Sequence, residues 1–506
     1  MTLKEKVLQT FIVTIREINK HGEPKEFFEK YPVGGMYYSY LKGSEGTVEV
    51  GTGLNPARLA ECRAASKLPL FVCADGTAMR GQTVSTSAEA VGSIQTEEAA
   101  YNYGKLLGMQ MNDNTVDWIL MPIVDLLYSH EMPLFAVSND PETTAKLNRA
   151  IIRGIQEQGV CATAKHFPGI GTCNINMHFG PGQNVLSYDE WMKTYGYVYK
   201  EAFKENLASV MTTHMTFRAY DDEGENGYYP IATYSSKLTT DLLKGELGFE
   251  GAVVTDALIM GGMATGNLIE ETVQSFKAGA DFLLWPPVEA ADRIVEALES
   301  GEIPMSRLDD AISRIALLRN RIFSFQPKEN TDVSGLAERT VKQIAENCSY
   351  IVSNELGLIP LDAKKYKKIR IVGMAPDPNE CMSLSHELAD EFKKHGAETE
   401  VIRNWDNYLK DHRTETDRNY DLIVYAMFYG MEHPTMMFRE DELSAHSALS
   451  FDRDKTVIIS FRSPYLYREY FETAETFVNS QVIGMKECVE ALYGEKEFKG
   501  KASVKY

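Results

Sequence analysis

The sequence predicts a (β/α)8 TIM-type barrel followed by a smaller α/β three-layer sandwich domain. Along residues 1–324, apolar segments of strand length alternate with segments of helical periodicity. Because the strand segments are apolar on both faces, they are typical of a parallel sheet covered on both sides by helices. The carboxyl ends of barrel strands meet at one face, where catalytic residues gather. Five of the predicted strands end on polar residues of this kind, namely Asp75, Asp125, Lys165 with His166, His214 and Asp256.

The elements of the predicted barrel follow one another regularly after a first helix at residues 3–30, where Leu3, Val7 and Phe11 recur at helical spacing. Seven strands can be assigned, at residues 31–38, 68–74, 118–124, 160–164, 208–213, 251–255 and 280–285. Helices are predicted between and after them, at residues 56–66, 96–111, 141–158, 188–206, 236–247, 270–278, 288–299 and 305–321. No eighth strand can be assigned from the pattern, so the closure of the barrel stays open at this point.

A break in the pattern at residues 325–335 predicts a linker, because Pro327 interrupts a polar run there. The domain before it is residues 1–324, and a second domain covers residues 336–506. The second domain begins with helical sequence at residues 336–352. Its apolar strands, at residues 368–374, 421–426 and 455–460, alternate with helical sequence, which is typical of an α/β sandwich.

Composition excludes some classes of partner. The 506 residues carry a net charge of −20, which disfavours binding to a nucleic-acid backbone or to an anionic membrane. The seven cysteines are scattered without metal-ligand spacing, as expected for reduced thiols. The charged first residues lack the apolar core of a signal peptide, and no run approaches the roughly 18 apolar residues of a membrane span. We therefore expect a cytoplasmic protein without metal or cofactor.

One loop has the composition of a pocket rim. The strand 160–164 is followed by Lys165 and His166, and Pro168, Gly169 and Gly171 then prevent regular structure from continuing. From these residues alone, a binding loop and a solvent-exposed turn are equally good interpretations.

The order Lys165-His166-Phe167-Pro168-Gly169, with Gly171 two residues on and His178 after that, resembles the signature of glycoside hydrolase family 3. The similarity is greatest to the bacterial β-N-acetylglucosaminidase branch. It implies a barrel with a second α/β domain and a retaining β-glycosidase. The chain departs from the family pattern where a histidine is usual at Ile170, and where Asp-Ser-His is usual at Asn176-Met177-His178.

The resemblance implies that Asp256 is the nucleophile, because residues 248–260 are similar to the family's nucleophile strand. Retaining cleavage needs a carboxylate that attacks the anomeric carbon and a second group that protonates the leaving oxygen. An aspartate after a strand is also a frequent cap of the next helix, which is the alternative interpretation.

The resemblance gives His178 the role of acid/base, with Asn176 in place of the aspartate that usually polarises it. An amide can orient an imidazole but has no charge to stabilise the imidazolium. A structural role for His178 is one alternative. Another is an acid from the second domain, such as Glu432 beside His433.

The resemblance also implies that Asp75, Lys165 and His166 bind sugar hydroxyls, since charged groups make paired hydrogen bonds to vicinal hydroxyls. His214 is expected to line the pocket. For each, an ion pair or a cap at a strand end is the alternative. Two arginines usual in the family are replaced by Thr83 and Phe135, which changes what the site can hold.

The expected function is hydrolysis of a β-linked amino sugar or related hexose from a small carbohydrate or glycoconjugate, through a covalent glycosyl-enzyme. Two alternatives remain. One is a weakened homologue that binds sugar without cleaving it, which the altered residues Asn176, Ile170, Thr83 and Phe135 motivate. The other is an enzyme that transfers the glycosyl group to phosphate or another acceptor. The sequence does not indicate an oligomeric state.

Overall fold

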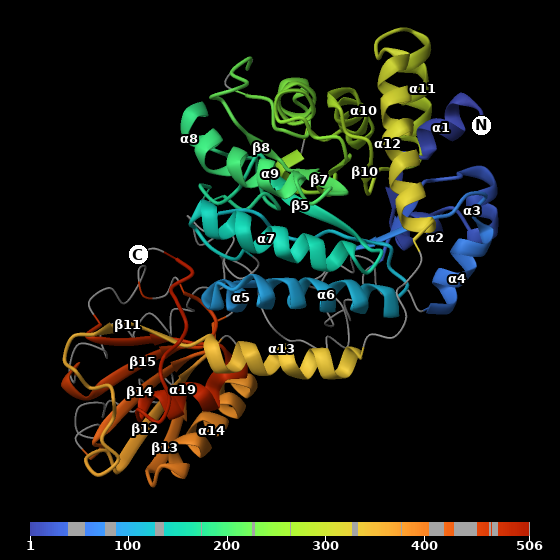
Figure 1. Ribbon diagram of the computed structural model, residues 1–506. Coiled ribbons are helices and arrows are strands. Elements are labelled where there is room, and N and C mark those ends of the chain that lie inside the picture. The colour runs from blue at the N-terminus through green and yellow to red at the C-terminus, as the bar shows by residue number, and fades with distance from the viewer. Residues whose placement is uncertain are drawn as a thin grey trace. The chain divides into compact units, whose positions relative to one another are not determined.

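The computed structural model describes residues 1–38, 56–75, 88–126, 136–173, 175–224, 228–263, 265–325, 332–375, 377–403, 419–429, 453–464, 467 and 474–504. The chain divides into two compact units (Figure 1). The first comprises Met1–Val84, Ala100–Ser129 and Thr144–Leu336, and the second comprises Ser85–Ala99, His130–Thr143 and Ala337–Tyr506. The predicted domain boundaries stay a prediction.

The first unit is a barrel of eight parallel strands, so the predicted fold class is confirmed. Its strands are β1 (Phe11–Val13), β2 (Gly35–Tyr37), β3 (Phe71–Ala74), β4 (Trp118–Ile119), β5 (Cys161–Phe167), β7 (Ser209–Thr212), β9 (Ala252–Thr255) and β10 (Leu283–Leu284). The sheet order is β10-β1-β2-β3-β4-β5-β7-β9. A parallel bridge between Val254 and Phe282 joins the two outer strands and closes the barrel.

The predicted helix at residues 3–30 is wrong, and the missing eighth strand lies inside it. The structure has α1 (Leu3–Leu8), β1, α2 (Ile15–Lys20) and α3 (Pro24–Lys30) instead. Phe11, Ile12 and Val13 are all 0% exposed. A strand buried on both faces is a short apolar run, which by periodicity cannot be told from part of a buried helix. Thr14 begins α2 by accepting a hydrogen bond from the backbone of Glu17.

Helices surround the strands of the first unit (Figure 1). They are α4 (Pro56–Ala65), α6 (Glu97–Asp113), α7 (Pro141–Gln156), α8 (Tyr188–Lys193), α9 (Tyr195–Phe203), η1 (Lys237–Glu246), η2 (Gly261–Met263), α10 (Leu268–Ala278), α11 (Ala290–Glu299) and α12 (Met305–Phe323). Two short strands, β6 (Gly182–Gln183) and β8 (Met215–Thr216), pair outside the barrel. None of the described helices is long and apolar enough to cross a membrane.

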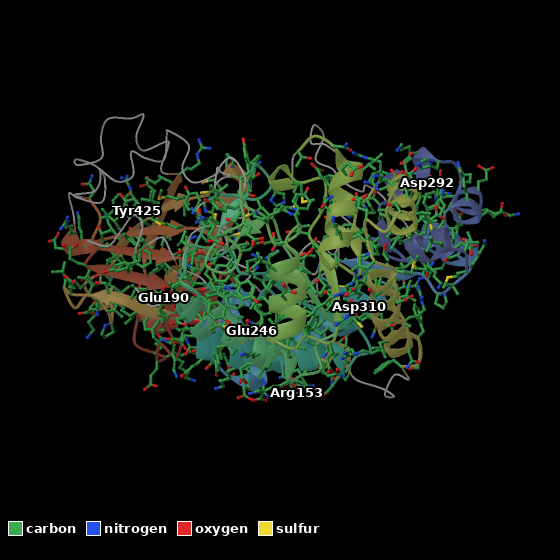
Figure 2. The ribbon with its side chains drawn as sticks, turned by 90° about the horizontal axis from the view of Figure 1, so that it is seen from above. Arg153, Glu190, Glu246, Asp292, Asp310 and Tyr425 are labelled. Carbon is green, nitrogen blue, oxygen red and sulfur yellow. The ribbon has the colours of Figure 1, made fainter. Side chains whose placement is uncertain are left out.

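An ion-pair cluster fixes the amino ends of the last two barrel strands. Asp281, which is fully buried, accepts hydrogen bonds from Lys244 (2.8 Å), Arg307 (2.6 Å) and the backbone of Val253 (2.8 Å). Lys244 and Arg307 also pair with Asp310, which is labelled in Figure 2. The cluster ties η1 and α12 to β9, the strand that leads to Asp256.

The second unit contains a mixed sheet with the order β11-β16-β15-β14-β12-β13, in which only the β11–β16 pair is antiparallel. The strands are β11 (Tyr350–Asn354), β12 (Lys368–Met374), β13 (Glu398–Arg403), β14 (Leu422–Met427), β15 (Thr456–Ser460) and β16 (Thr476–Asn479). The helices are α5 (Ala88–Ile94), α13 (Val333–Asn347), α14 (Pro378–Lys394), η4 (Arg453–Lys455), η6 (Val482–Gly484) and α19 (Met485–Leu492). Separate apolar clusters form on the two faces of the sheet, one of them with α14 and α19.

Candidate active site

The polar residues predicted from the strand ends meet at the carboxyl end of the barrel. Asp75 follows β3, Lys165 and His166 lie in the last residues of β5, and Asp256 follows β9. Neighbouring parallel strands place these ends beside one another. The structure therefore brings the predicted residues together.

Close packing explains the composition of the loop after Lys165. Phe167 is fully buried against the rings of Trp191 and Tyr199. A Cβ on Gly169, whose φ is +111°, would lie 2.3 Å from the ring of Tyr195. A Cβ on Gly171 would lie 1.7 Å from the carbonyl oxygen of Leu126. The loop thus accepts only glycine at both positions while it anchors the end of β5.

Asp75 is held by two donors. Lys165 Nζ donates to Asp75 Oδ1 at 2.7 Å, and the Tyr37 hydroxyl donates to Asp75 Oδ2 at 2.7 Å. Burial, together with the Asp75 carboxylate, raises the pKa of Tyr37 well above its usual value, so the hydroxyl stays protonated and continues to donate. Lys165 is 8% exposed and Asp75 remains partly exposed. The pair offers an ammonium and a carboxylate side by side, which suits vicinal hydroxyls.

His166 is oriented by Asp125, a strand-end residue that was not among the predicted site residues. Asp125 Oδ2 accepts hydrogen bonds from the His166 backbone and pairs with His166 Nδ1, both at 2.9 Å. Its Oδ1 accepts from the backbone of Ile170 at 2.8 Å. Because a carboxylate only accepts, the proton lies on Nδ1. The strand-end pattern that identified Asp75 and Asp256 is the signal for Asp125 too.

Asp256 is held as a carboxylate. Its Oδ1 accepts from the backbone of Ala257 and its Oδ2 from the Thr213 hydroxyl, both at 2.9 Å. Burial by itself would raise the pKa of Asp256. The charges of His166, His214 and Lys165, with the Ala257 hydrogen bond, outweigh burial, so the pKa lies below the ordinary value. Asp256 is therefore ionised at neutral pH, as a nucleophile must be.

His214 lies behind Asp256 and is fully buried. Its Nδ1 pairs with the Thr233 hydroxyl at 3.0 Å, and its Nε2 donates to the carbonyl of Ala257 at 3.1 Å. Burial lowers the pKa of His214. Both ring nitrogens bond within the protein, so the geometry supports positioning of Asp256 better than a contact with sugar, and the predicted role of His214 stays a prediction.

His178 lies on an exposed loop that is pinned to the segment after Asp256. The backbone of Gly261 donates to the carbonyl of His178 at 3.0 Å, and that of Gly262 donates to Met177 at 2.9 Å. A Cβ on Gly261 would lie 2.6 Å from the His178 carbonyl, so this close approach needs glycine. Gly261 and Gly262, which the motif did not single out, are the signal in the sequence that the loop docks there.

Asn176 supports His178 as expected of an amide. Asn176 Oδ1 lies 2.8 Å from His178 Nδ1 and accepts from the His178 backbone at 2.9 Å. A carbonyl oxygen only accepts, so Nδ1 carries the proton and Nε2 is left as the other basic nitrogen. Thr83, Phe135, Glu432 and His433 lie outside the described residues. The catalytic and binding roles of all these residues stay predictions.

Among the described residues of the first unit, one cluster has side chains of the kind that bind cations. Its ligand atoms lie within 4.8 Å of one another and belong to Glu17, His21 and Glu289. Lys20 already lies 3.7 Å from Glu17 and 3.4 Å from Glu289, so its ammonium competes with any cation for the two carboxylates.

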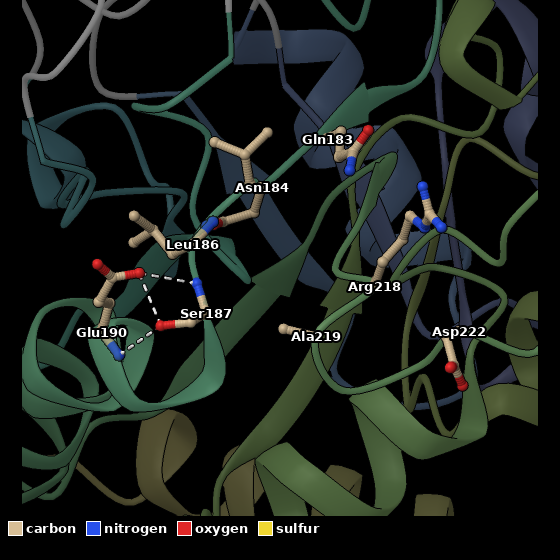
Figure 3. A pocket seen from close by; sticks show the side chains of 9 residues that line it. Gln183, Asn184, Leu186, Ser187, Glu190, Arg218, Ala219 and Asp222 are labelled. Atoms are coloured by element: carbon tan, nitrogen blue, oxygen red, sulfur yellow. Dashed lines mark hydrogen bonds between the residues drawn. The ribbon is translucent and has the colours of Figure 1, made fainter.

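A separate open hollow of about 510 Å³ lies beside α8 (Figure 3). It is lined by Gln183, Asn184, Val185, Leu186, Ser187, Glu190, Arg218, Ala219 and Asp222. Ser187 and Glu190 hydrogen-bond each other as the capping box of α8. None of the strand-end residues described above lines this hollow.

Comparison with known proteins identifies the family. The model of the glycosyl hydrolase family 3 N terminal domain matches residues 2–318. The chain belongs to glycosyl hydrolase family 3. The resemblance noted in the sequence is thereby confirmed, and the protein is a glycoside hydrolase.

One distant relative and two solved structures span most or all of this family 3 hydrolase. It is 23% identical over 511 residues to a beta-N-acetylglucosaminidase/beta-glucosidase of Cellulomonas fimi, covering 93% of this chain and 88% of that one. A family 3 beta-N-acetylglucosaminidase structure from Paenibacillus sp. str. FPU-7 matches with a TM-score of 0.80 at 22% identity, over 100% of this chain and 99% of the other. The beta-glucoside phosphorylase BglX bound to 2FGlc matches with a TM-score of 0.82 at 23% identity, over 100% and 94%. At these identities the structural matches show the fold.

Proposed function

We propose that this protein is a retaining β-glycosidase that cleaves a β-linked amino sugar or related hexose through a covalent glycosyl-enzyme. The observation that carries the proposal is the ionised carboxylate of Asp256. It lies at a barrel strand end near His166, His214 and Lys165. The name of the Cellulomonas fimi relative, a beta-N-acetylglucosaminidase/beta-glucosidase, supports the substrate class.

In the first step, a carboxylate oxygen of Asp256 forms a bond to the anomeric carbon as the glycosidic C–O bond breaks. His178, in its imidazolium form with a proton on each ring nitrogen, delivers the Nε2 proton to the leaving oxygen, and Nε2 is then the base of the second step. In the second step, His178 takes a proton from water, whose oxygen attacks the anomeric carbon and releases Asp256 as a carboxylate. General acid–base help of this kind contributes about 10²–10⁴-fold to the rate.

The remaining residues hold the sugar. Asp75 and Lys165 bind neighbouring hydroxyls as acceptor and donor, and the Tyr37 hydroxyl keeps Asp75 in place. His166, fixed by Asp125, presents its other ring nitrogen to the substrate. Those of these hydrogen bonds that strengthen as the sugar ring flattens stabilise the transition state more than the bound substrate.

Hydrolysis of a panel of aryl β-glycosides by wild type and Asp256→Ala tests the proposal. Good leaving groups need little protonation, so they report the nucleophile alone. We expect turnover by wild type only, and a 2-deoxy-2-fluoro glycoside should leave a glycosyl adduct on Asp256 that mass spectrometry detects. Inertness of wild type across the panel would favour a sugar-binding homologue without turnover.

A second candidate is transfer of the glycosyl group to phosphate. Asn176 is the observation that favours it, because a neutral amide beside His178 repels an anionic acceptor less than the usual carboxylate would. One of the structural matches is named a beta-glucoside phosphorylase, which agrees with this chemistry. Turnover of an aryl glycoside in phosphate buffer would then yield a sugar 1-phosphate, seen by ³¹P NMR, instead of free sugar.

A further inference from the structure

Trp285, which follows β10, has an unusual backbone. Its φ is +65°, in the left-handed region that bulky residues rarely adopt. Leu284 before it packs into the apolar interior of the barrel, so regular alternation would send the next side chain to the outer face. The indole nevertheless packs against the same interior cluster. The backbone turn therefore directs a large aromatic ring into the barrel, and such outliers concentrate at ligand sites.

The indole lies one side chain away from the predicted sugar ligands. Its ring meets that of Tyr37 edge-on, with centroids 5.1 Å apart and planes at 76°. The Tyr37 hydroxyl in turn donates to Asp75, which also accepts from Lys165. Trp285 is partly exposed. It thus belongs to the wall of the site that also carries Asp75.

The indole N–H of Trp285 differs from those of the other described tryptophans. Trp118 Nε1 donates to the Thr163 and Ser209 hydroxyls, and Trp191 Nε1 donates to the Pro168 carbonyl. Trp285 Nε1 is shielded from solvent and has no hydrogen-bond partner within the described structure. Buried polar groups are nearly always hydrogen-bonded, so an exception at a binding site points to an acceptor supplied by a ligand.

We propose that Trp285 binds the sugar in the subsite next to Asp256. Its ring face contacts the C–H face of the pyranose, and its N–H donates to one sugar oxygen. The ligand class is a neutral pyranose, because Lys165 on the same wall is already paired with Asp75. The inference rests on the proposed function and adds a residue that selects the sugar.

Binding measured without turnover tests this role. Glucose, N-acetylglucosamine and their monodeoxy analogues are titrated into the full chain by calorimetry. Trp285→Phe keeps an aromatic face but removes the N–H, and we expect Kd to rise about three- to tenfold, the value of one hydrogen bond. Trp285→Ala should raise Kd by about 10²-fold. Tyr197→Phe, an exposed aromatic change on α9, is the matched control and should bind like wild type.

The deoxy sugars separate a direct hydrogen bond from a structural effect. One monodeoxy analogue should bind wild type about three- to tenfold more weakly than its parent and bind Trp285→Phe as the parent does. Equal Kd values for wild type and Trp285→Phe overturn the proposal, and so does the absence of saturable binding by wild type. The aryl glycoside assay is evaluated separately. If wild type cleaves aryl glycosides while Trp285→Phe binds sugar as wild type does, this inference is wrong and the proposed function stands.

Discussion

Asp256 in the barrel and Glu89 in the second unit are two acidic side chains whose pKa values are shifted in opposite directions. Asp256 faces His166, His214 and Lys165, and its pKa lies below the ordinary value. Glu89 on α5 is 0% exposed and meets neutral partners, the Gln481 amide and the Ser503 hydroxyl. Burial raises the pKa of Glu89 to about 8, and the two hydrogen bonds lower it only partly. Neighbouring charge therefore decides whether such a carboxyl group is ionised and available for chemistry.

Removal of the carboxylate at Asp256 should have the largest effect. Asp256→Asn keeps the shape but not the charge, and we expect kcat/KM for aryl β-glycosides to fall at least about 10⁴-fold, since the proposed nucleophile is lost. Asp241→Asn, an exposed carboxyl on η1, is the matched control and should be fully active. Substantial turnover by Asp256→Asn would show that another residue is the nucleophile.

Glu89→Gln should stabilise the second unit at alkaline pH. In the folded chain Glu89 keeps its proton up to about pH 8, whereas its ordinary pKa is 4.5. The contribution of protonated Glu89 to the free energy of unfolding is therefore complete below pH 4.5, declines as the pH rises, and is lost above about pH 8. Since one pKa unit is about 1.4 kcal/mol, the loss approaches about 5 kcal/mol.

Urea unfolding from pH 6 to 9 measures this difference. Wild type should lose stability relative to Glu89→Gln as the pH rises, while Glu98→Gln, an exposed change on α6, should follow wild type. Parallel pH curves for wild type and Glu89→Gln would show that Glu89 is charged in the folded protein.

Lys165→Met tests whether the charge of Lys165 lowers the pKa of Asp256. Loss of this charge should raise the pKa of Asp256, so the acid limb of the kcat/KM profile moves to higher pH. Loss of the Lys165 contact with Asp75, and of its proposed contact with sugar, should lower kcat/KM about 10- to 10²-fold at neutral pH. Lys200→Met, exposed on α9, should change neither quantity. An unmoved acid limb would mean that the histidines alone hold Asp256 ionised.

Asn176→Asp should have the smallest effect, since it adds a charge beside an exposed side chain. A carboxylate at 2.8 Å from Nδ1 would stabilise the His178 imidazolium and raise its pKa. We expect about a tenfold gain in rate for poor leaving groups and none for good ones. Asn320→Asp on α12 serves as control. No gain for any leaving group would place the acid elsewhere.

The resemblance in the sequence and the strand-end pattern account for much of the site. The motif predicts Lys165 and His166, the residues that flank Asp256 predict Asp256, and the structure brings the three together. Asp125 was visible as a strand end, but its hold on His166 depends on the loop geometry after β5. The docking of the His178 loop on Gly261 and Gly262 is likewise a contact between segments far apart in the chain.

The sequence by itself determined the alternation of apolar strands and helices, and with it the barrel and the positions of the strand ends. Only the tertiary structure decided that Phe11–Val13 is a strand and that Trp285 turns inward. It also decided that Asp256 meets cations while Glu89 meets an amide and a hydroxyl. The physical reason is that periodicity records which face of a segment is buried, whereas backbone reversals and electrostatic neighbours are set by residues distant in sequence.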